Sequence, residues 1–201
     1  MEYLLLGGFF IWPIVLESIL GLWVIIERSF YMLSVLPRKR RALSELVASL
    51  REGGQNPTIP EQLGKFAKAV RKAYGERMLN VSLLTVQAEE LVKGVERYLT
   101  MLHIVAQTAP LLGLLGTVTG MIRVFMTIES QTIAGQQVSP SDLAGGIWEA
   151  LITTAAGLIV GIPALIAYIA FSRVVDRFVV EADAVVSQVA HEASRAGLEV
   201  V

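Results

Sequence analysis

Four threonines and one glutamate are the candidate chemical groups inside two long apolar runs of the chain. Thr117 and Thr119 lie in the run at residues 104–128, and Glu149, Thr153 and Thr154 lie in the run at residues 149–172. A threonine hydroxyl can donate a hydrogen bond to a carboxylate and accept one from a carboxylic acid. These hydroxyls can therefore solvate both forms of a titrating carboxyl without holding a charge themselves.

The threonines share their helix faces with residues that have little side-chain bulk. On helices, spacings of three and four residues align one set in each run: Ala109, Gly113, Gly116, Thr117 and Gly120 in the first, and Ala150, Thr153, Thr154, Gly157, Gly161 and Ala164 in the second. Small residues at this spacing let membrane helices approach closely.

Two interpretations of these small faces stay open. In one they only pack helices, with the threonines bonded back to their own backbone. In the other they form a partly wet surface that faces a central partner helix and supports proton movement. Because one chain has little interior for two such faces, they indicate an oligomer around another element.

A proline interrupts each of these two runs. Pro110 and Pro163 remove a backbone donor, which leaves the carbonyls of Ala106 and Ile159 without their usual helical partner. Such carbonyls are available to water or to a protein donor.

Residues 3–26 form another apolar run, which contains one acid, Glu17. At about 1.5 Å per residue, the run is long enough to cross a hydrocarbon core of about 30 Å. A charged carboxyl there costs about 2.5–3.5 kcal/mol on insertion scales. Glu17 is therefore either a proton-handling carboxyl or a buried polar contact to a neighbouring helix.

The distribution of basic residues predicts the topology. Residues 27–103 hold 13 of the 17 Lys and Arg, including the run Arg38-Lys39-Arg40-Arg41. Basic residues beside a span favour the cytoplasmic side, and a nucleic-acid role for this run is a poor second because no aromatic residues are interleaved. We therefore predict a periplasmic N-terminus, a first span at 3–26, a cytoplasmic helical region at 27–103, a second span at 104–128, a periplasmic loop at 129–148, a third span at 149–172 and a cytoplasmic helical tail at 173–201.

The regions outside the spans are predicted to be helical. Apolar residues recur at helical spacing from about Asn80, with no break before the second span, so we expect one long helix there. An apolar stripe after Arg173 extends the third helix beyond the membrane, and the Gly- and Pro-rich residues 53–60 form a turn. The predicted fold class is an all-α membrane protein with three transmembrane helices.

The composition of the 201-residue chain argues against several other classes of protein. It is 54% hydrophobic, its net charge is −1, and it has no cysteine and only two histidines. We find no catalytic triad, no metal-ligand cluster and no phosphate-binding glycine loop, so we expect no enzyme, metal, cofactor or nucleic acid. No Lys or Arg precedes Arg28, which argues against a cleavable signal.

Two motifs resemble the MotA/TolQ/ExbB proton-channel family, and its TolQ/ExbB branch most. They are Ala109-Pro-Leu-Leu-Gly-Leu-Leu-Gly-Thr-Val-Thr-Gly120 and Leu143-Ala-Gly-Gly-Ile-Trp-Glu-Ala-Leu-Ile-Thr-Thr-Ala-Ala-Gly-Leu-Ile-Val-Gly-Ile-Pro163-Ala. The resemblance covers residues 89–172, and Glu27-Arg28 fits more loosely. The chain lacks the four-span plan of the flagellar protein MotA, which argues against a flagellar role.

The resemblance implies a pentamer in the bacterial inner membrane around helices of an ExbD/TolR-type partner. The partner's single span carries an aspartate that titrates as protons cross, and a TonB- or TolA-type protein receives the work. Thr117 and Thr154 match family threonines near that aspartate, and we expect them to be paired across a groove. Glu149 matches a glutamate at the outer end of the third span, where it either gathers cations or protons or anchors the helix N-terminus.

The sequence leaves several alternatives open. A structural scaffold that only stabilises a partner helix is the second hypothesis, and an enzyme or solute carrier is a weak third. The choice between TonB and Tol systems, the cargo, the use of H⁺ or Na⁺, and the roles of Glu17 and Arg123 stay undecided.

Overall fold

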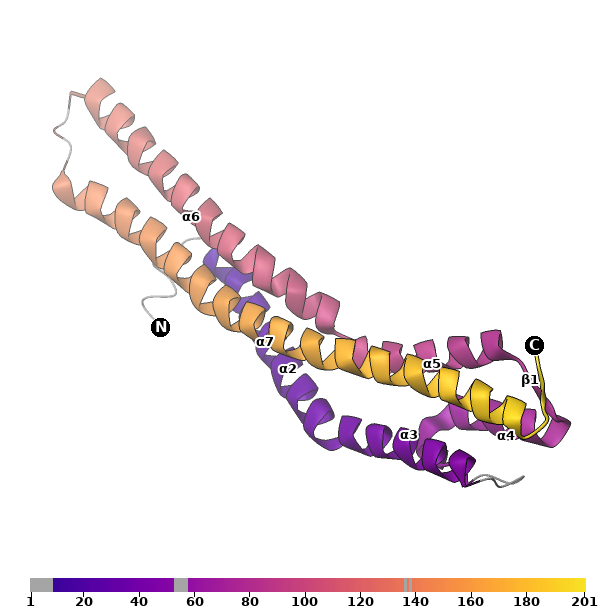
Figure 1. The fold of residues 1–201 in the computed structure, drawn as a ribbon. Coiled ribbons are helices and arrows are strands. Elements are labelled where there is room, and N and C mark those ends of the chain that lie inside the picture. Colours follow the sequence, from indigo (N-terminus) through magenta and orange to yellow (C-terminus); the bar gives the residue numbers. More distant parts are fainter. Residues whose placement is uncertain (1–8, 53–57, 136, 138) are drawn as a thin grey trace. The chain divides into compact units, whose positions relative to one another are not determined.

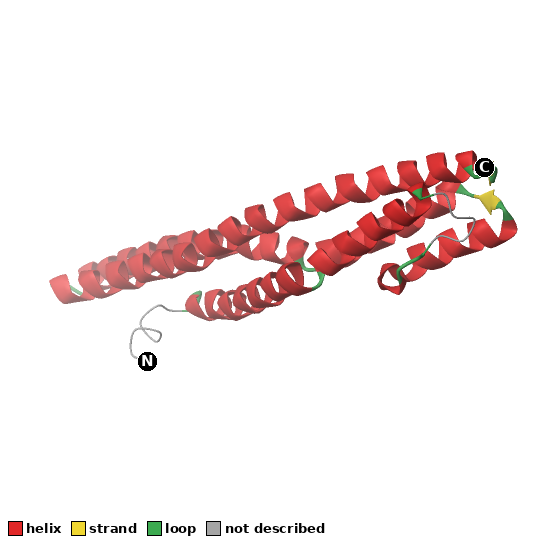
Figure 2. Ribbon diagram, turned by 60° about the horizontal axis from the view of Figure 1, so that its bottom comes forward, coloured by secondary structure: helices red, strands yellow, loops and turns green. Residues whose placement is uncertain are grey.

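The computed structural model describes residues 9–52, 58–135, 137 and 139–201, without the side chains of residues 141 and 142. Its helices are α2 (Ile11–Ser34), α3 (Leu36–Arg51), η1 (Glu61–Leu63), α4 (Gly64–Glu76), α5 (Val81–Glu96), α6 (Leu99–Ile133) and α7 (Pro140–Arg195). Strands β1 (Met78–Leu79) and β2 (Glu199–Val200) form a short parallel pair (Figures 1 and 2). The start of the predicted first span, at residues 3–8, and residues 53–57 of the predicted turn lie outside the described residues.

The predicted fold class is confirmed. Three segments of the described chain are long and apolar enough to cross a membrane, at Ile11–Arg51, Leu99–Ile133 and Leu143–Arg195. The continuation of the third helix far beyond its span is also confirmed, because α7 runs to Arg195.

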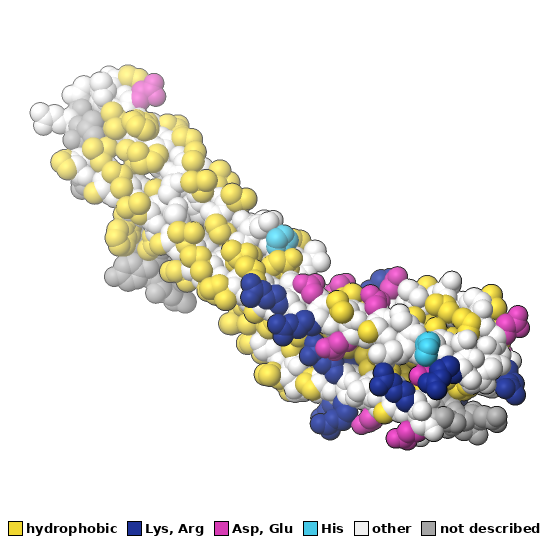
Figure 3. Space-filling view, in the orientation of Figure 1, with side chains coloured by type: hydrophobic (Ala, Val, Ile, Leu, Met, Phe, Trp, Pro, Cys, Tyr) yellow, Lys and Arg dark blue, Asp and Glu magenta, His cyan; other side chains and the backbone are white. Residues whose placement is uncertain are grey.

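The chain divides into two compact units. Unit 1 comprises Met1–Ile26 and Tyr98–Ile169, and unit 2 comprises Glu27–Arg97 and Ala170–Val201. Unit 1 has an apolar outer surface, with Trp12, Phe125 and Ile159 all more than 60% exposed. Hydrophobic side chains cover the visible face of this unit, whereas Lys, Arg, Asp and Glu side chains gather on unit 2 (Figure 3). An apolar exterior of this kind suits contact with lipid.

Unit 2 is a helical assembly with its own core. Phe66, Leu84 and Phe178 are almost fully buried in it, and they come from α4, α5 and α7. The side chain of Asn80 accepts a hydrogen bond from the Leu83 amide at 2.9 Å, which caps the start of α5.

The prediction of one uninterrupted helix from Asn80 into the second span is wrong. Helix α5 ends at Glu96, α6 begins at Leu99, and Tyr98 between them has a left-handed φ of 68°. This conformation costs a non-glycine residue about 1–2 kcal/mol. The Tyr98 ring meets Trp23 edge to face at 5.3 Å between centroids, a contact that offsets part of the cost.

The connection between α6 and α7 is shorter than the predicted loop at 129–148. Helix α6 continues to Ile133 and α7 begins at Pro140, so only residues 134–139 separate the two helices. Proline suits the first position of a helix because its missing N–H has no intrahelical acceptor there. A short connection makes α6 and α7 antiparallel neighbours, and this arrangement places the predicted site residues.

Candidate functional site

The small faces of α6 and α7 pack against each other within one chain. A Cβ added at Gly157 would lie 2.5 Å from the Ala109 carbonyl oxygen, and one at Gly113 would lie 2.9 Å from the Thr153 carbonyl oxygen. A Cβ at Gly120 would lie 2.9 Å from the Ala150 Cβ. Only glycine permits such close approach of two helix backbones. We call this contact the α6–α7 seam.

This packing corrects the expectation that the small faces need an outside element to cover them. Each face finds its counterpart on the other helix, because the short connection brings the two into one layer. Ala109 is fully buried, and Ala150 and Ala164 are almost fully buried. Within the described chain, the glycines of the seam therefore lie where two helix backbones approach closely.

Thr153 lies inside the seam. Its side chain is 1% exposed, and its hydroxyl donates to the Ala150 carbonyl at 2.8 Å, with the Glu149 carbonyl at 3.1 Å. A Cβ added at Gly116 would collide with the Thr153 hydroxyl. Thr153 therefore packs against α6, whereas the sequence predicted a partner-facing position.

Thr154 fastens the two helices through a hydrogen bond. Its hydroxyl donates to the Gly113 carbonyl on α6 at 2.9 Å, although Gly113 is 41 residues away in the chain. Thr117, half-buried on α6, donates to the Leu114 carbonyl of its own helix at 2.6 Å. The expected Thr117–Thr154 pairing is not seen among the described contacts, since each hydroxyl proton is committed to a carbonyl.

The two prolines have different surroundings. The ring of Pro110 lies against Gly161 of α7, where any side chain would meet the ring carbons at 2.5 and 2.6 Å. Pro163 is exposed on α7. Pro110 is therefore part of the seam, and Gly161 provides the space for its ring.

An ion pair that was not predicted from the sequence joins α6 to α7. Arg123 Nη2 lies 2.6 Å from Glu149 Oε1, and Arg123 Nη1 donates to Oε2 at 3.1 Å, which makes the pair bidentate. The Glu149 side chain is 19% exposed and that of Arg123 is 53% exposed. Arg123 lies near the end of the apolar run at residues 104–128 and Glu149 begins the run at residues 149–172, so a short connection between antiparallel helices would have brought the two charges together.

Glu149 does not anchor the N-terminus of its helix. Helix α7 begins nine residues earlier, at Pro140, and the helix dipole acts mainly within the first turn. The Arg123 guanidinium is instead the charge that faces this carboxylate.

Glu17 contacts α6 outside the seam. Its Oε1 lies 2.6 Å from the hydroxyl of Thr108, and its Oε2 is buried without a hydrogen-bond partner among the described residues. The alternative of a buried polar contact to a neighbouring helix is therefore realised.

Glu27 and Arg28 form a cluster of charged side chains in unit 2. Arg28 is 2% exposed and donates to the Val95 carbonyl at 2.9 Å and to both carboxylate oxygens of Glu27. This hydrogen bonding and the nearby positive charges hold the pKa of Glu27 below its ordinary value, against the opposing effect of burial.

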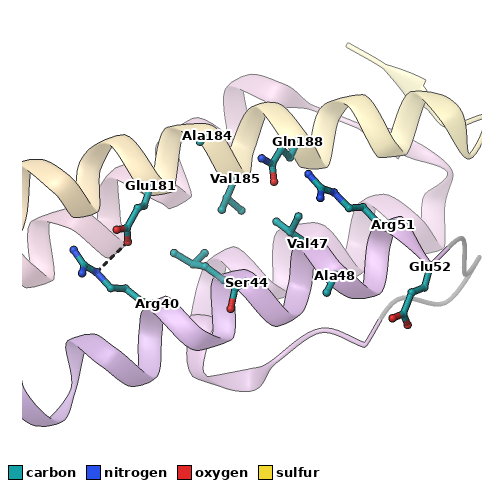
Figure 4. A pocket seen from close by; sticks show the side chains of 11 residues that line it. Arg40, Ser44, Val47, Ala48, Arg51, Glu52, Glu181, Ala184, Val185 and Gln188 are labelled. Atoms are coloured by element: carbon teal, nitrogen blue, oxygen red, sulfur yellow. Dashed lines mark ion pairs between the residues drawn. The ribbon is translucent and has the colours of Figure 1, made fainter.

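A groove of about 640 Å³ lies between α3 and α7 (Figure 4). Its walls are largely apolar, and Arg40 Nε pairs with Glu181 Oε2 at 3.0 Å at its edge. None of the threonines of the seam lines this groove. Within the described part of the chain, no cluster of His, Cys, Asp and Glu could hold a metal ion.

The seam residues lie within a sequence region that matches known proteins. The sequence model of the MotA/TolQ/ExbB proton channel family matches residues 60–184, which include α4, α5, all of α6 and most of α7. The chain belongs to this family.

Named relatives agree with the family match. A putative biopolymer transport protein, ExbB-like 1, of Synechocystis is 31% identical over 84% of this chain and 68% of its own length. Biopolymer transport protein exbB1 of Vibrio cholerae is 28% identical over 79% of this chain and 72% of its own. ExbB of Neisseria gonorrhoeae is 39% identical over 39% of this chain and 34% of its own. With three apolar helices, this family member is a membrane protein.

Proposed function

We propose that the chain is the channel subunit of a proton-driven complex in the bacterial inner membrane. The observation that carries the proposal is the family match over α6 and most of α7, the helices that hold the threonines and the Arg123–Glu149 pair. The relatives named as biopolymer transport proteins support a role in energising transport. In this proposal the chain forms a homopentamer around an ExbD/TolR-type partner whose single span carries an aspartate.

The proposed orientation follows from charge. The N-terminus is periplasmic and the C-terminus cytoplasmic, because the basic residues concentrate at 27–103 and in the tail. The connection at residues 134–139 then lies on the periplasmic side. A TonB- or TolA-type protein receives the work from that side.

Thr117 and Thr154 are the proposed contacts for the partner's aspartate. Both hydroxyl protons are donated to carbonyls, so each oxygen is free to accept a hydrogen bond from a protonated aspartate. To donate to the charged aspartate, a hydroxyl must rotate and release its carbonyl. The hydrogen bonds seen in the structure therefore favour the protonated form of the partner's aspartate. Because Thr154 donates to the Gly113 carbonyl, a change in the bonding of Thr154 also changes a contact of the α6–α7 seam.

The Arg123–Glu149 pair places a fixed dipole beside the pathway. The bidentate guanidinium of Arg123 holds the Glu149 carboxyl group in position between α6 and α7. Thr153, which is enclosed in the seam, has a packing role in this proposal.

A structural scaffold is the second candidate function. One observation favours it: the small faces close on each other, and the hydroxyls of Thr117, Thr153 and Thr154 all donate to backbone carbonyls. A scaffold needs no exchange of these bonds, so the two functions predict different effects of removing a hydroxyl.

Proton uptake by vesicles tests the two functions against each other. The chain is reconstituted with the ExbD/TolR-type protein encoded in the same genome, a potassium diffusion potential is imposed in sodium-free buffer, and an internal pH dye is followed. We expect uptake only when both proteins are present. Thr154→Val, which keeps the shape, should lose most of the uptake, and the matched control Thr154→Ser should keep it.

Three results of the uptake assay distinguish the channel function from the scaffold function. Full uptake by an assembled Thr154→Val complex would refute the role of the hydroxyl. No uptake by an assembled wild-type complex, with or without sodium, would favour the scaffold. Uptake that requires sodium would replace the proton with Na⁺ as the coupling ion.

A further inference from the structure

The groove between α3 and α7 lies within unit 2 and carries a charged side chain of α3 at each end. Its volume of about 640 Å³ falls in the range of roughly 300–1,000 Å³ that is typical of sites for small molecules. From Arg40 to Arg51 it follows α3 for about 16 Å, at 1.5 Å per residue. None of the residues proposed to meet the partner's aspartate lines it, so it is a separate site.

The middle of the groove has apolar walls on both helices. Leu43, Val47 and Ala48 line it from α3, and Ala184 and Val185 line it from α7. Ala48 and Ala184 are exposed, so the groove is open to a ligand from outside. An apolar chain placed there would remove its own surface and that of the walls from water, which is the main driving force for such binding.

The charges at one end of the groove offset each other. Arg40 Nε on α3 lies 3.0 Å from Glu181 Oε2 on α7 (Figure 4). A ligand therefore needs no charged group at this end.

Arg51 at the opposite end has no such partner. No carboxylate of the described residues forms an ion pair with it, and residues 53–57 contain no Asp or Glu. The side chains of Arg51 and Gln188 point into the space between the helices, whereas that of Glu52 points away from α7 (Figure 4). The groove therefore offers an unpaired guanidinium beside an amide.

These features define the chemistry of a ligand. A guanidinium binds a carboxylate through two parallel N–H···O bonds, and the amide of Gln188 can donate another. A long-chain fatty acid combines a carboxylate, which is ionised at neutral pH, with a single apolar chain. It matches the unpaired charge at one end, the apolar walls and the neutral ion pair at the other end.

A helix of a partner protein fits this groove less well than a single chain does. A helix with its side chains is about 10–12 Å across, so 640 Å³ would enclose only about 6–8 Å of its length, little more than one turn.

We infer that the groove between α3 and α7 binds one long-chain fatty acid. The carboxylate pairs with Arg51 and accepts from Gln188, and the chain lies between the apolar walls towards the Arg40–Glu181 pair. The binding is non-covalent. The inference concerns unit 2 alone and does not depend on the proposed channel function.

Photolabelling of the full chain in lipid nanodiscs tests this assignment. The probe is palmitic acid with a diazirine midway along its chain, and peptide mapping locates the adducts. We expect adducts on both walls of the groove, at residues 43–48 and 184–185. Excess palmitic acid should suppress them, and hexadecanol, which has no carboxylate, should require about tenfold more to do so, because hydrogen bonds to a charged group are lost.

Two substitutions and a matched control locate the ligand. Arg51→Gln should lower the labelling of the groove about tenfold at a probe concentration below saturation, because the guanidinium charge is removed. Ala184→Trp should abolish this labelling, because the new side chain fills part of the groove. The matched control is Arg41→Gln, an exposed cation on α3 that does not line the groove, and it should leave the labelling unchanged.

Three results would contradict this assignment. Adducts confined to the apolar spans would overturn the inference and leave the groove to a second copy of the chain or to a partner helix. Undiminished labelling in Arg51→Gln, or equal competition by hexadecanol and palmitic acid, would overturn the pairing of a carboxylate with Arg51. An equal loss in Arg41→Gln and Arg51→Gln would replace this pairing with a general effect of positive charge.

Discussion

The substitution Gly157→Ala is the most direct perturbation of the α6–α7 seam. The new Cβ would lie 2.5 Å from the Ala109 carbonyl oxygen and 3.1 Å from the Gly113 Cα, whereas ordinary contact begins at 3.4 Å. All of these neighbouring atoms belong to backbone, so no side-chain rotation can relieve the overlap. The helices must separate locally by about 0.9 Å, the difference between the first distance and ordinary contact.

Such a separation weakens several contacts at once. A gap of 0.5–1 Å forfeits about a quarter to a half of each dispersion contact, and overpacking of a core costs about 1–3 kcal/mol. The Thr154–Gly113 hydrogen bond crosses the same place, and bonds of this kind are worth about 0.6 kcal/mol in membranes. The better helix propensity of alanine returns up to about 1 kcal/mol. We expect a net loss of about 1–2 kcal/mol in the free energy of unfolding.

The matched control is Gly145→Ala on the same helix. A Cβ there has nothing within 4 Å, so this variant should gain about 0.5–1 kcal/mol from propensity. Unfolding in mixed micelles of increasing SDS fraction, followed by circular dichroism, measures both variants. A Gly157→Ala protein as stable as Gly145→Ala would refute the close approach of α6 and α7.

Three further predictions address the seam, its ion pair and the Glu27 cluster. Because the chain has no cysteine, the double variant Gly120→Cys/Ala150→Cys tests the seam by oxidation. The two Cβ atoms would lie 2.9 Å apart, so the helices must separate locally to reach the roughly 3.5–4.5 Å of a disulfide, which should then form within one chain. It would be seen as a mobility change without a dimer on denaturing gels, and a cross-linked dimer would place the contact between subunits. Arg123→Gln and Glu149→Gln should each lower the free energy of unfolding, and the sum of the two losses should exceed the loss in the double variant by about 1 kcal/mol. Additive losses in this double-mutant cycle would contradict the ion pair. The neighbouring guanidinium lowers the folded pKa of Glu27 below 4.5, so its contribution to stability is present above pH 4.5 and is lost as the pH falls through the folded value. The SDS unfolding midpoint of the wild type should therefore fall more steeply below pH 4.5 than that of Glu27→Gln, and parallel curves would contradict this.

Much of the architecture follows from patterns within single helices. Three apolar runs predict three membrane helices, and the apolar stripe after Arg173 predicts that α7 continues beyond its span. A spacing of three and four residues assigns the small residues of α6 and α7 to one face each, because the helical period fixes which side chains share a face. The order and spacing of the two motifs also pointed to the family, which the comparison with its sequence model confirms.

The break before the second span escaped prediction because its signal is tertiary. Arg97-Tyr98 contains neither glycine nor proline, and a left-handed Tyr98 is unfavourable on local grounds. Its ring packs on Trp23, a residue 75 positions earlier, so the conformation depends on a contact that helix periodicity does not encode.

The pairing of helix faces was also decided by tertiary structure. The sequence by itself determined that α6 and α7 each carry a small face, that Arg123 and Glu149 lie near the ends of their apolar runs, and that Glu17 lies inside the first apolar run. The tertiary structure decided that the small faces meet each other, that Arg123 reaches Glu149, and that Glu17 reaches Thr108. The physical reason is that periodicity fixes directions around one helix axis, whereas rotation and axial register between helices result from summed contacts along their whole lengths.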